Sequence, residues 1–284
     1  MVPENIETTY LKPGEARLNI EKPLQTSRGA LRLAILYLLA ITGAEVVTNF
    51  YNSLGGVIAN IILLTALIVH SSLITDSPNH KLLLSLSLAP LTRIMSLTMP
   101  LVQFPPIYWY LIIYPPLLLA CLVTMYRLRF SAREVGVTIQ KLPVQLGVMV
   151  GGFVFGIVEY LILRPEPLVA TLYWKEMLLP IFVLMAGTGL VEEFMFRGVM
   201  QRAALEALGK WGLPYVALIF AILHLIHNSA VDIVFVFVVG LFFGWIVKKT
   251  GSLFGVTLSH GITNCTLYLI APFFAEYLKI PFVS

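Results

Sequence analysis

The chain has 284 residues, of which 58% are apolar and only 12% are charged. Soluble domains carry about 25% charged residues, so this composition excludes an ordinary soluble protein and predicts an integral membrane protein. The formal net charge of +4 does not indicate nucleic acid as a partner. The partner that so apolar a chain requires is the lipid bilayer.

Residues 1–29 form a polar segment that lacks the pattern of a cleavable signal peptide, and we expect it to lie in the cytoplasm. Nine apolar stretches follow it, and about 20 such residues in a helix cross about 30 Å of hydrocarbon. The third stretch is the least regular because Pro90 and Arg93 interrupt it. The expected helices are residues 30–50, 55–74, 82–101, 107–126, 144–163, 176–208, 213–227, 233–247 and 253–278.

The predicted fold is therefore an all-α, polytopic transmembrane bundle with eight or nine spans. Its expected parts are the polar segment 1–29, the N-terminal membrane helices with a basic connector in 30–143, and a membrane core in 144–284. Basic residues gather in alternate connections, and basic loops stay in the cytoplasm. The pattern predicts a multi-pass protein of the cell membrane, or of the endoplasmic reticulum membrane in a eukaryote.

Small residues mark close helix contacts. Glycines 147, 151, 152 and 156 lie along one expected span and approximate an interface at which a second helix can approach closely. Cys121 and Cys265 both lie in apolar stretches, where packing explains them, and they offer neither a disulfide framework nor metal-binding spacing.

Three ionisable residues, Glu192, Glu193 and Arg197, lie close together inside the sixth stretch. They belong to the segment GTGLVEEFMFRGVMQR, residues 187–202. Each is unfavourable in a membrane helix by about 2.5–3.5 kcal/mol. Glu193 and Arg197 are four residues apart, acid first, which favours an ion pair on one helix face. Glu192 points about 100° away and has no such cation, so we expect it to face a polar cavity as a general base for water. The alternative is one structural ion network of all three.

Two further helices supply polar pairs. Phe220 and His224 are four residues apart on the seventh stretch, and His227 follows near its end, where an interfacial position is expected. His260 and Asn264 are four residues apart on the ninth and can donate hydrogen bonds to a developing oxyanion. The alternatives are core hydrogen bonding for the histidines and an interhelical hydrogen bond for His260 and Asn264.

The remaining intramembrane ionisable residues are Glu45, Arg93 and Glu159. Each can line the cavity or pair with another charged side chain. Glu159 follows Gly156 on the fifth expected helix and is the strongest candidate of the three to line the cavity.

The segments EEFMFR, FAILH and HGITN resemble, in order, the three motifs of the CAAX protease and bacteriocin-processing family. The resemblance covers residues 187–267 and implies an intramembrane endopeptidase that cleaves near the C-terminus of a prenylated or membrane-associated protein or peptide, with its site toward the cytoplasm. It implies that Glu192 and His224 activate water, and that His260 and Asn264 stabilise the oxyanion. Glu193 and Arg197 take supporting positions.

Zinc is the cofactor to weigh, because two histidines and a glutamate can hold it with an open position for water. The HExxH pattern is absent and the candidates come from three helices, so we expect a glutamate-activated water and no cofactor. Two rival functions remain open. One is a non-catalytic membrane partner or scaffold of the same family, and the other is an ion-coupled transporter that uses the buried carboxylates.

Overall fold

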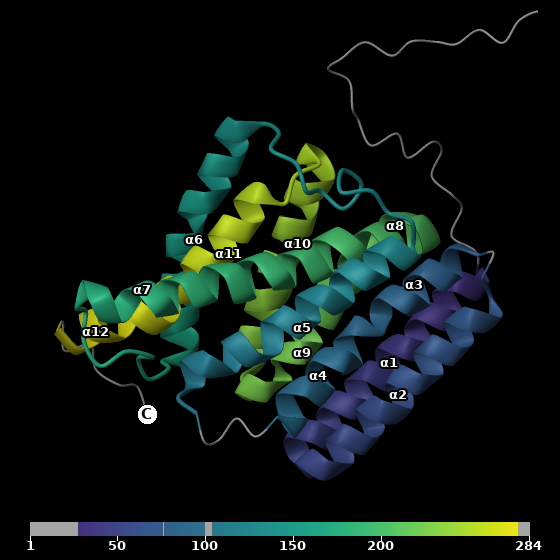
Figure 1. The fold of residues 1–284 in the computed structure, drawn as a ribbon, viewed down its shortest axis with the longest axis horizontal. Coiled ribbons are helices and arrows are strands. Elements are labelled where there is room, and N and C mark those ends of the chain that lie inside the picture. The colour runs from purple at the N-terminus through teal and green to yellow at the C-terminus, as the bar shows by residue number, and fades with distance from the viewer. Residues whose placement is uncertain (1–27, 76, 100–103, 278–284) are drawn as a thin grey trace, which may run out of the picture.

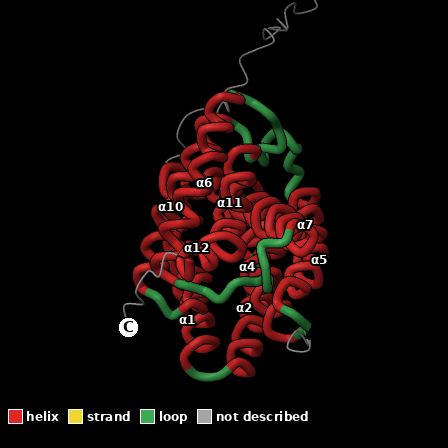
Figure 2. The backbone as a smooth tube through the Cα atoms, turned by 90° about the vertical axis from the view of Figure 1, so that its left-hand side faces the viewer, coloured by secondary structure: helices red, strands yellow, loops and turns green. Residues whose placement is uncertain are grey.

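The computed structural model describes residues 28–75, 77–99 and 104–277, and every regular element in these ranges is a helix. The helices pack side by side in one bundle (Figure 1 and Figure 2), which confirms the all-α prediction. Most of the predicted polar segment, residues 1–27, lies outside the described residues.

In chain order, with η marking the π- and 3-10-helical elements, the helices are α1 Arg28–Phe50, α2 Ser53–Leu73, α3 Pro78–Leu86, α4 Leu88–Thr98, α5 Pro106–Arg127, α6 Leu142–Leu163, α7 Trp174–Val183, η2 Leu184–Glu192, η3 Phe194–Met200, α8 Gln201–Leu208, η4 Gly209–Trp211, α9 Gly212–Leu223, η5 His224–His227, α10 Ala230–Thr250, α11 Phe254–Cys265, η6 Thr266–Ile270 and α12 Ala271–Tyr277.

By length and composition, six helical segments of the described chain can cross a membrane. The segment of 54 residues contains two of the expected helices, which separate at Gly209, where the backbone adopts a φ of +55° that favours glycine. The six are Arg28–Phe50, Ser53–Leu73, Ile107–Arg127, Leu142–Leu163, Trp174–His227 and Ala230–Thr250.

The expected helix 82–101 is instead two short helices, α3 and α4, which meet at Ser87. Pro90 gives the physical reason, because it has no N–H to donate to the carbonyl of Leu86 and so interrupts the helical hydrogen bonds at that point. Neither short helix is long enough to be counted among the six segments, and residues 100 and 101 lie outside the described residues.

The helical rod that carries the adjacent glutamates runs from Trp174 to Leu208, close to the predicted 176–208. Its middle consists of two π-helical stretches, η2 and η3, on either side of Glu193. Such wider turns within α-helices occur frequently at functional sites, because they change the direction in which the following side chains point.

The small-residue interface on α6 lies at two of its four glycines. A Cβ on Gly152 would meet the carbonyl oxygen of Ser259, and one on Gly156 would meet the carbonyl oxygen of Thr263, both on α11. A Cβ on Gly147 would meet nothing within 4 Å. The contact matters for the site, since α11 carries two of the predicted site residues and α6 fixes its position.

We predict that Gly152→Leu lowers the melting temperature of the detergent-solubilised protein. A side chain at this position must push α6 away from the backbone of α11, and overpacking of this kind is destabilising by about 1–3 kcal/mol. Gly147→Leu on the same helix is the matched control and should leave the melting temperature within error. Equal melting temperatures for the two variants would contradict the assigned interface.

Candidate active site

A cavity of about 340 Å³ lies within the bundle, and its mostly apolar lining includes the polar side chains that the sequence singled out. Its volume is in the range of small-molecule and cofactor sites, about 300–1,000 Å³. Side chains from α4, α5, α6, η2, η3, α9, η5, α10, α11 and η6 line it. All four predicted catalytic residues are among them: Glu192, His224, His260 and Asn264.

The two adjacent glutamates have different surroundings, as their spacing predicted. Glu193 is fully buried and accepts a hydrogen bond of 2.9 Å from Nη1 of Arg197, so the pair lies on one helix face. The guanidinium packs over the ring of Phe220 at 4.2 Å. Neither member of the pair lines the cavity. Arg197 therefore neutralises Glu193 behind the cavity wall and leaves Glu192 as the carboxylate that faces inward.

His260 connects the two glutamates, a contact that the spacing of the motifs did not reveal. Its Nδ1 lies 2.8 Å from Oε1 of Glu193, and its Nε2 lies 3.8 Å from Oε2 of Glu192. Because a carboxylate accepts hydrogen bonds, Nδ1 is the protonated nitrogen of this contact. The buried carboxylate fixes the orientation of the ring and directs Nε2 toward Glu192 and the cavity.

Tyr114 on α5 also contacts Glu192, and none of the sequence motifs indicated it. Its hydroxyl donates a hydrogen bond to Oε1 of Glu192. The ring of Tyr110, one turn earlier, stacks on the Tyr114 ring with centroids 5.7 Å apart. The one signal in the sequence was a pair of tyrosines four residues apart on an apolar span. That signal does not distinguish a site residue from an aromatic of the membrane interface.

His224 is held at the end of α9. Its Nδ1 lies 3.0 Å from the carbonyl oxygen of Phe220, which can only accept, so Nδ1 donates and Nε2 of the neutral ring carries the lone pair. The Phe220 ring lies between the two histidines, 4.8 Å from His224 and 6.0 Å from His260. His227 is exposed at the end of η5, where it also lines the cavity.

Asn264 is buried and lines the cavity one turn after His260 on α11. The helix is held there by Thr263, whose hydroxyl lies 3.2 Å from the carbonyl oxygen of Gly152 on α6. The predicted stripe of His260 and Asn264 therefore faces the same space as Glu192 and His224.

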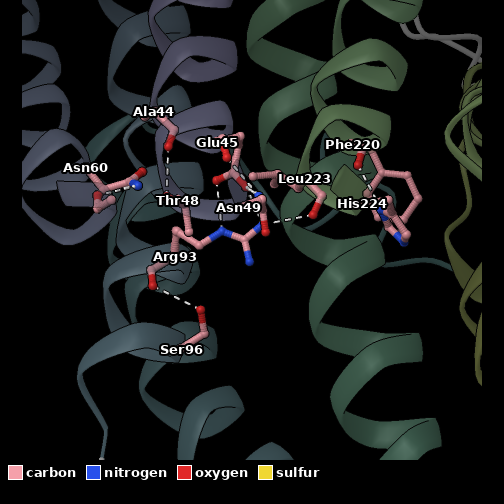
Figure 3. A network of polar contacts seen from close by, with 11 residues as sticks. Ala44, Glu45, Thr48, Asn49, Asn60, Arg93, Ser96, Phe220, Leu223 and His224 are labelled. Carbon is pink, nitrogen blue, oxygen red and sulfur yellow. Dashed lines mark hydrogen bonds and ion pairs between the residues drawn. The ribbon is translucent and has the colours of Figure 1, made fainter. Parts of the chain in front are cut away.

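The other ionisable residues near the site have different surroundings. Glu159 lines the cavity. Glu45 on α1 and Arg93 on α4 form a buried ion pair with a shortest distance of 2.6 Å (Figure 3). Asp232 at the start of α10 was not singled out from the sequence. It is fully buried, and neither carboxylate oxygen has a hydrogen-bond partner among the described residues.

The donor set does not fit zinc in this arrangement. Zinc is held by several N, O or S ligands at about 2.0–2.3 Å. Within the described residues, no three His, Cys, Asp or Glu side chains are grouped so that they could hold a metal ion.

Comparison with known proteins identifies the segment that carries this site. Residues 174–266 match the family model described as "Type II CAAX prenyl endopeptidase Rce1-like", a match that implies a protease. No curated protein and no solved structure matches the chain. The matched segment contains all six predicted site residues, whereas Tyr114 and Arg93 precede it. Residues 174–266 of this multi-pass membrane protein are therefore similar to the Rce1-like CAAX prenyl endopeptidases.

Proposed function

We propose that the protein is an intramembrane endopeptidase that hydrolyses a peptide bond near the C-terminus of a prenylated or otherwise membrane-associated protein or peptide. One observation carries the proposal. Glu192 lines the cavity without an Arg or Lys partner, whereas the adjacent Glu193 is paired with Arg197. A structural ion network would not require this second carboxylate, and hydrolysis with water as the nucleophile does.

In this proposal Glu192 is the general base. It takes a proton from a water molecule while the water oxygen attacks the scissile carbonyl carbon. The neutral His224 ring offers its Nε2 lone pair to the second proton of the same water and so orients the nucleophile. The proton held by Glu192 then passes to the leaving amine as the C–N bond breaks, and a carboxylic acid and an amine are released.

The tetrahedral intermediate carries a negatively charged oxygen that needs hydrogen-bond donors. The amide of Asn264 and Nε2–H of a protonated His260 serve this purpose, and the Glu193 carboxylate favours the protonated ring. Donors that are oriented before the reaction stabilise the transition state without further reorganisation. We place the protein in the cell membrane, or in the endoplasmic reticulum membrane of a eukaryote, with the site accessible from the cytoplasm.

Glu192→Gln is predicted to fold normally and to lose cleavage of a farnesylated CAAX peptide by at least about 10²-fold, the usual contribution of a general base. Product is measured by mass spectrometry after incubation with protein in proteoliposomes. Glu166→Gln, in the exposed loop after α6, is the matched control and should retain the wild-type rate. Wild-type cleavage by Glu192→Gln would contradict the assigned role. Full complementation of a deletion strain by the same variant would favour a scaffold.

Tyr114→Phe is predicted to lower kcat by about tenfold or more with little change in KM. The hydroxyl donates to the carboxylate that takes the proton, and a hydrogen bond to a charged group contributes about 1.5–3 kcal/mol. Tyr110→Phe removes the neighbouring hydroxyl from the same helix and is the control, with an expected change below about twofold. A similar loss in both variants would assign the effect to packing of the stacked rings.

Protein purified without chelator is predicted to contain zinc well below one atom per chain, and EDTA should leave the cleavage rate unchanged. The reason is that no three His, Cys, Asp or Glu side chains of the described residues are grouped so that they could hold a metal ion. Metal content is measured by inductively coupled plasma mass spectrometry. One zinc per wild-type chain that is lost in Glu192→Ala and in His224→Ala would reverse this prediction and assign a metallopeptidase.

A further inference from the structure

We propose that Arg93 is a carboxylate-binding residue that anchors the C-terminal carboxylate of the peptide substrate in the cavity. The inference rests on the proposed function, because it assigns a recognition group to the same site. Arg93 lies on α4, in the half of the chain that precedes the Rce1-like segment, and it lines the cavity that contains Glu192.

The hydrogen bonds of the Arg93 guanidinium leave one nitrogen free. Nε donates to Oε1 of Glu45 at 2.8 Å, and Nη2 donates to Oε2 of Glu45 at 2.6 Å and to the carbonyl oxygen of Leu223 at 2.8 Å. These bonds use three of the five N–H groups of a guanidinium. Both N–H groups of Nη1 have no acceptor among the described residues, and Figure 3 shows this nitrogen pointing away from Glu45 and Leu223.

Nη1 is not enclosed by the protein. The Arg93 residue as a whole is only 7% exposed and lines the cavity, yet Nη1 is not among the fully enclosed atoms that lack a partner. Buried polar groups in proteins are nearly always hydrogen-bonded. A nearly buried guanidinium beside a cavity, with two unused donors, is therefore arranged for an acceptor that arrives with a ligand.

Charge determines which acceptor fits. Arg93 is the one Arg or Lys side chain that lines the cavity in the described part of the chain, whereas Glu159 and Glu192 supply carboxylates there. An anionic group near Glu159 or Glu192 would meet like charge, whereas the Nη1 side of Arg93 offers two unused donors on a cation. A carboxylate oxygen is a strong acceptor for a guanidinium N–H. A peptide that is cleaved near its C-terminus brings such a group with it.

Glu45 fixes the guanidinium of Arg93 and leaves its Nη1 atom free. It occupies the edge of the guanidinium formed by Nε and Nη2, and its carboxylate also accepts a hydrogen bond of 3.4 Å at Oε2 from the amide of Asn49. The pair fixes the plane of the guanidinium, so the direction of the Nη1 donors is set before a ligand binds. Such preorganisation reduces the entropy that is lost on binding.

The anchor is also connected to the reacting groups. Nη2 bonds the carbonyl of Leu223, the last residue of α9, and His224 follows directly. Because Arg93 and Glu192 line one cavity of about 340 Å³, only a short peptide segment fits between them. A substrate held by its terminal carboxylate would therefore present a bond close to its C-terminus to Glu192.

The test compares two forms of one probe, an N-terminally fluorescent, farnesylated CAAX peptide with either a free C-terminal carboxylate or a C-terminal amide. Their affinities are measured by fluorescence anisotropy on full-length Glu192→Gln protein in detergent, so that cleavage does not interfere. The free acid is expected to bind about tenfold more tightly or better, as for hydrogen bonds to a charged group. Equal affinities of the two forms would overturn the proposal.

Two variants, made in the Glu192→Gln background, assign the preference to Arg93. Removing one partner of a buried ion pair leaves an uncompensated charge, so Glu45→Gln and Arg93→Gln are combined to keep the site neutral. The combined variant should bind acid and amide equally, whereas Glu45→Gln alone, which keeps the cation, should retain the preference. A preference that persists in the combined variant would refute the anchor. If that protein does not fold, Arg93→Lys, which lacks the second donor edge, replaces it and should reduce the acid-to-amide ratio.

These results are independent of the proposed catalysis. If wild-type protein cleaves neither peptide while the acid still binds better in an Arg93-dependent manner, the protease proposal fails and the anchor remains. If wild-type protein cleaves both peptides with equal kcat/KM, the protease proposal is supported and the anchor is refuted.

Discussion

The buried ion pair between Glu193 and Arg197 is the interaction on which the site depends. Charges inside an apolar bundle are stable only when they are paired, and removing one partner of such a pair is destabilising by about 3–5 kcal/mol. The pair also receives Nδ1 of His260, so it connects the π-helical part of the glutamate helix with α11. Because Arg197 is paired with Glu193, the neighbouring Glu192 has no Arg or Lys partner and lines the cavity.

The N-terminal helices complete the site, although they lie outside the matched segment. Tyr114 on α5 donates to Glu192, and Arg93 on α4 bonds the carbonyl that precedes His224. Arg93 is itself held by Glu45 on α1. In the proposed mechanism the helices that carry the motifs supply the reacting groups. The preceding helices contact two of those groups or their neighbours and provide the one Arg or Lys of the described cavity lining. In these proposals the catalytic groups come from the matched segment, and the group that recognises the substrate carboxylate comes from the helices before it.

Local spacing explains why part of the site could be predicted. Glu193 and Arg197 are close because four residues make about one helical turn, and the same periodicity places Asn264 beside His260. The small-residue interface was predicted on α6, but only Gly152 and Gly156 contact α11, because the direction of a neighbouring helix is not encoded in the glycine spacing. The prediction of one continuous helix at 82–101 was wrong, because Pro90 interrupts the helical hydrogen bonds near Ser87.

The sequence by itself determined the class of protein, the positions of most helices and the presence of an unpaired carboxylate, because hydropathy and helical periodicity are properties of neighbouring residues. Only the tertiary structure decided that Tyr114 bonds Glu192, that His260 bonds Glu193 and that Glu45 holds Arg93 beneath the end of α9. The first of these contacts joins residues 78 positions apart in the chain. Such pairings follow from how whole helices pack against one another, and no local pattern records that packing.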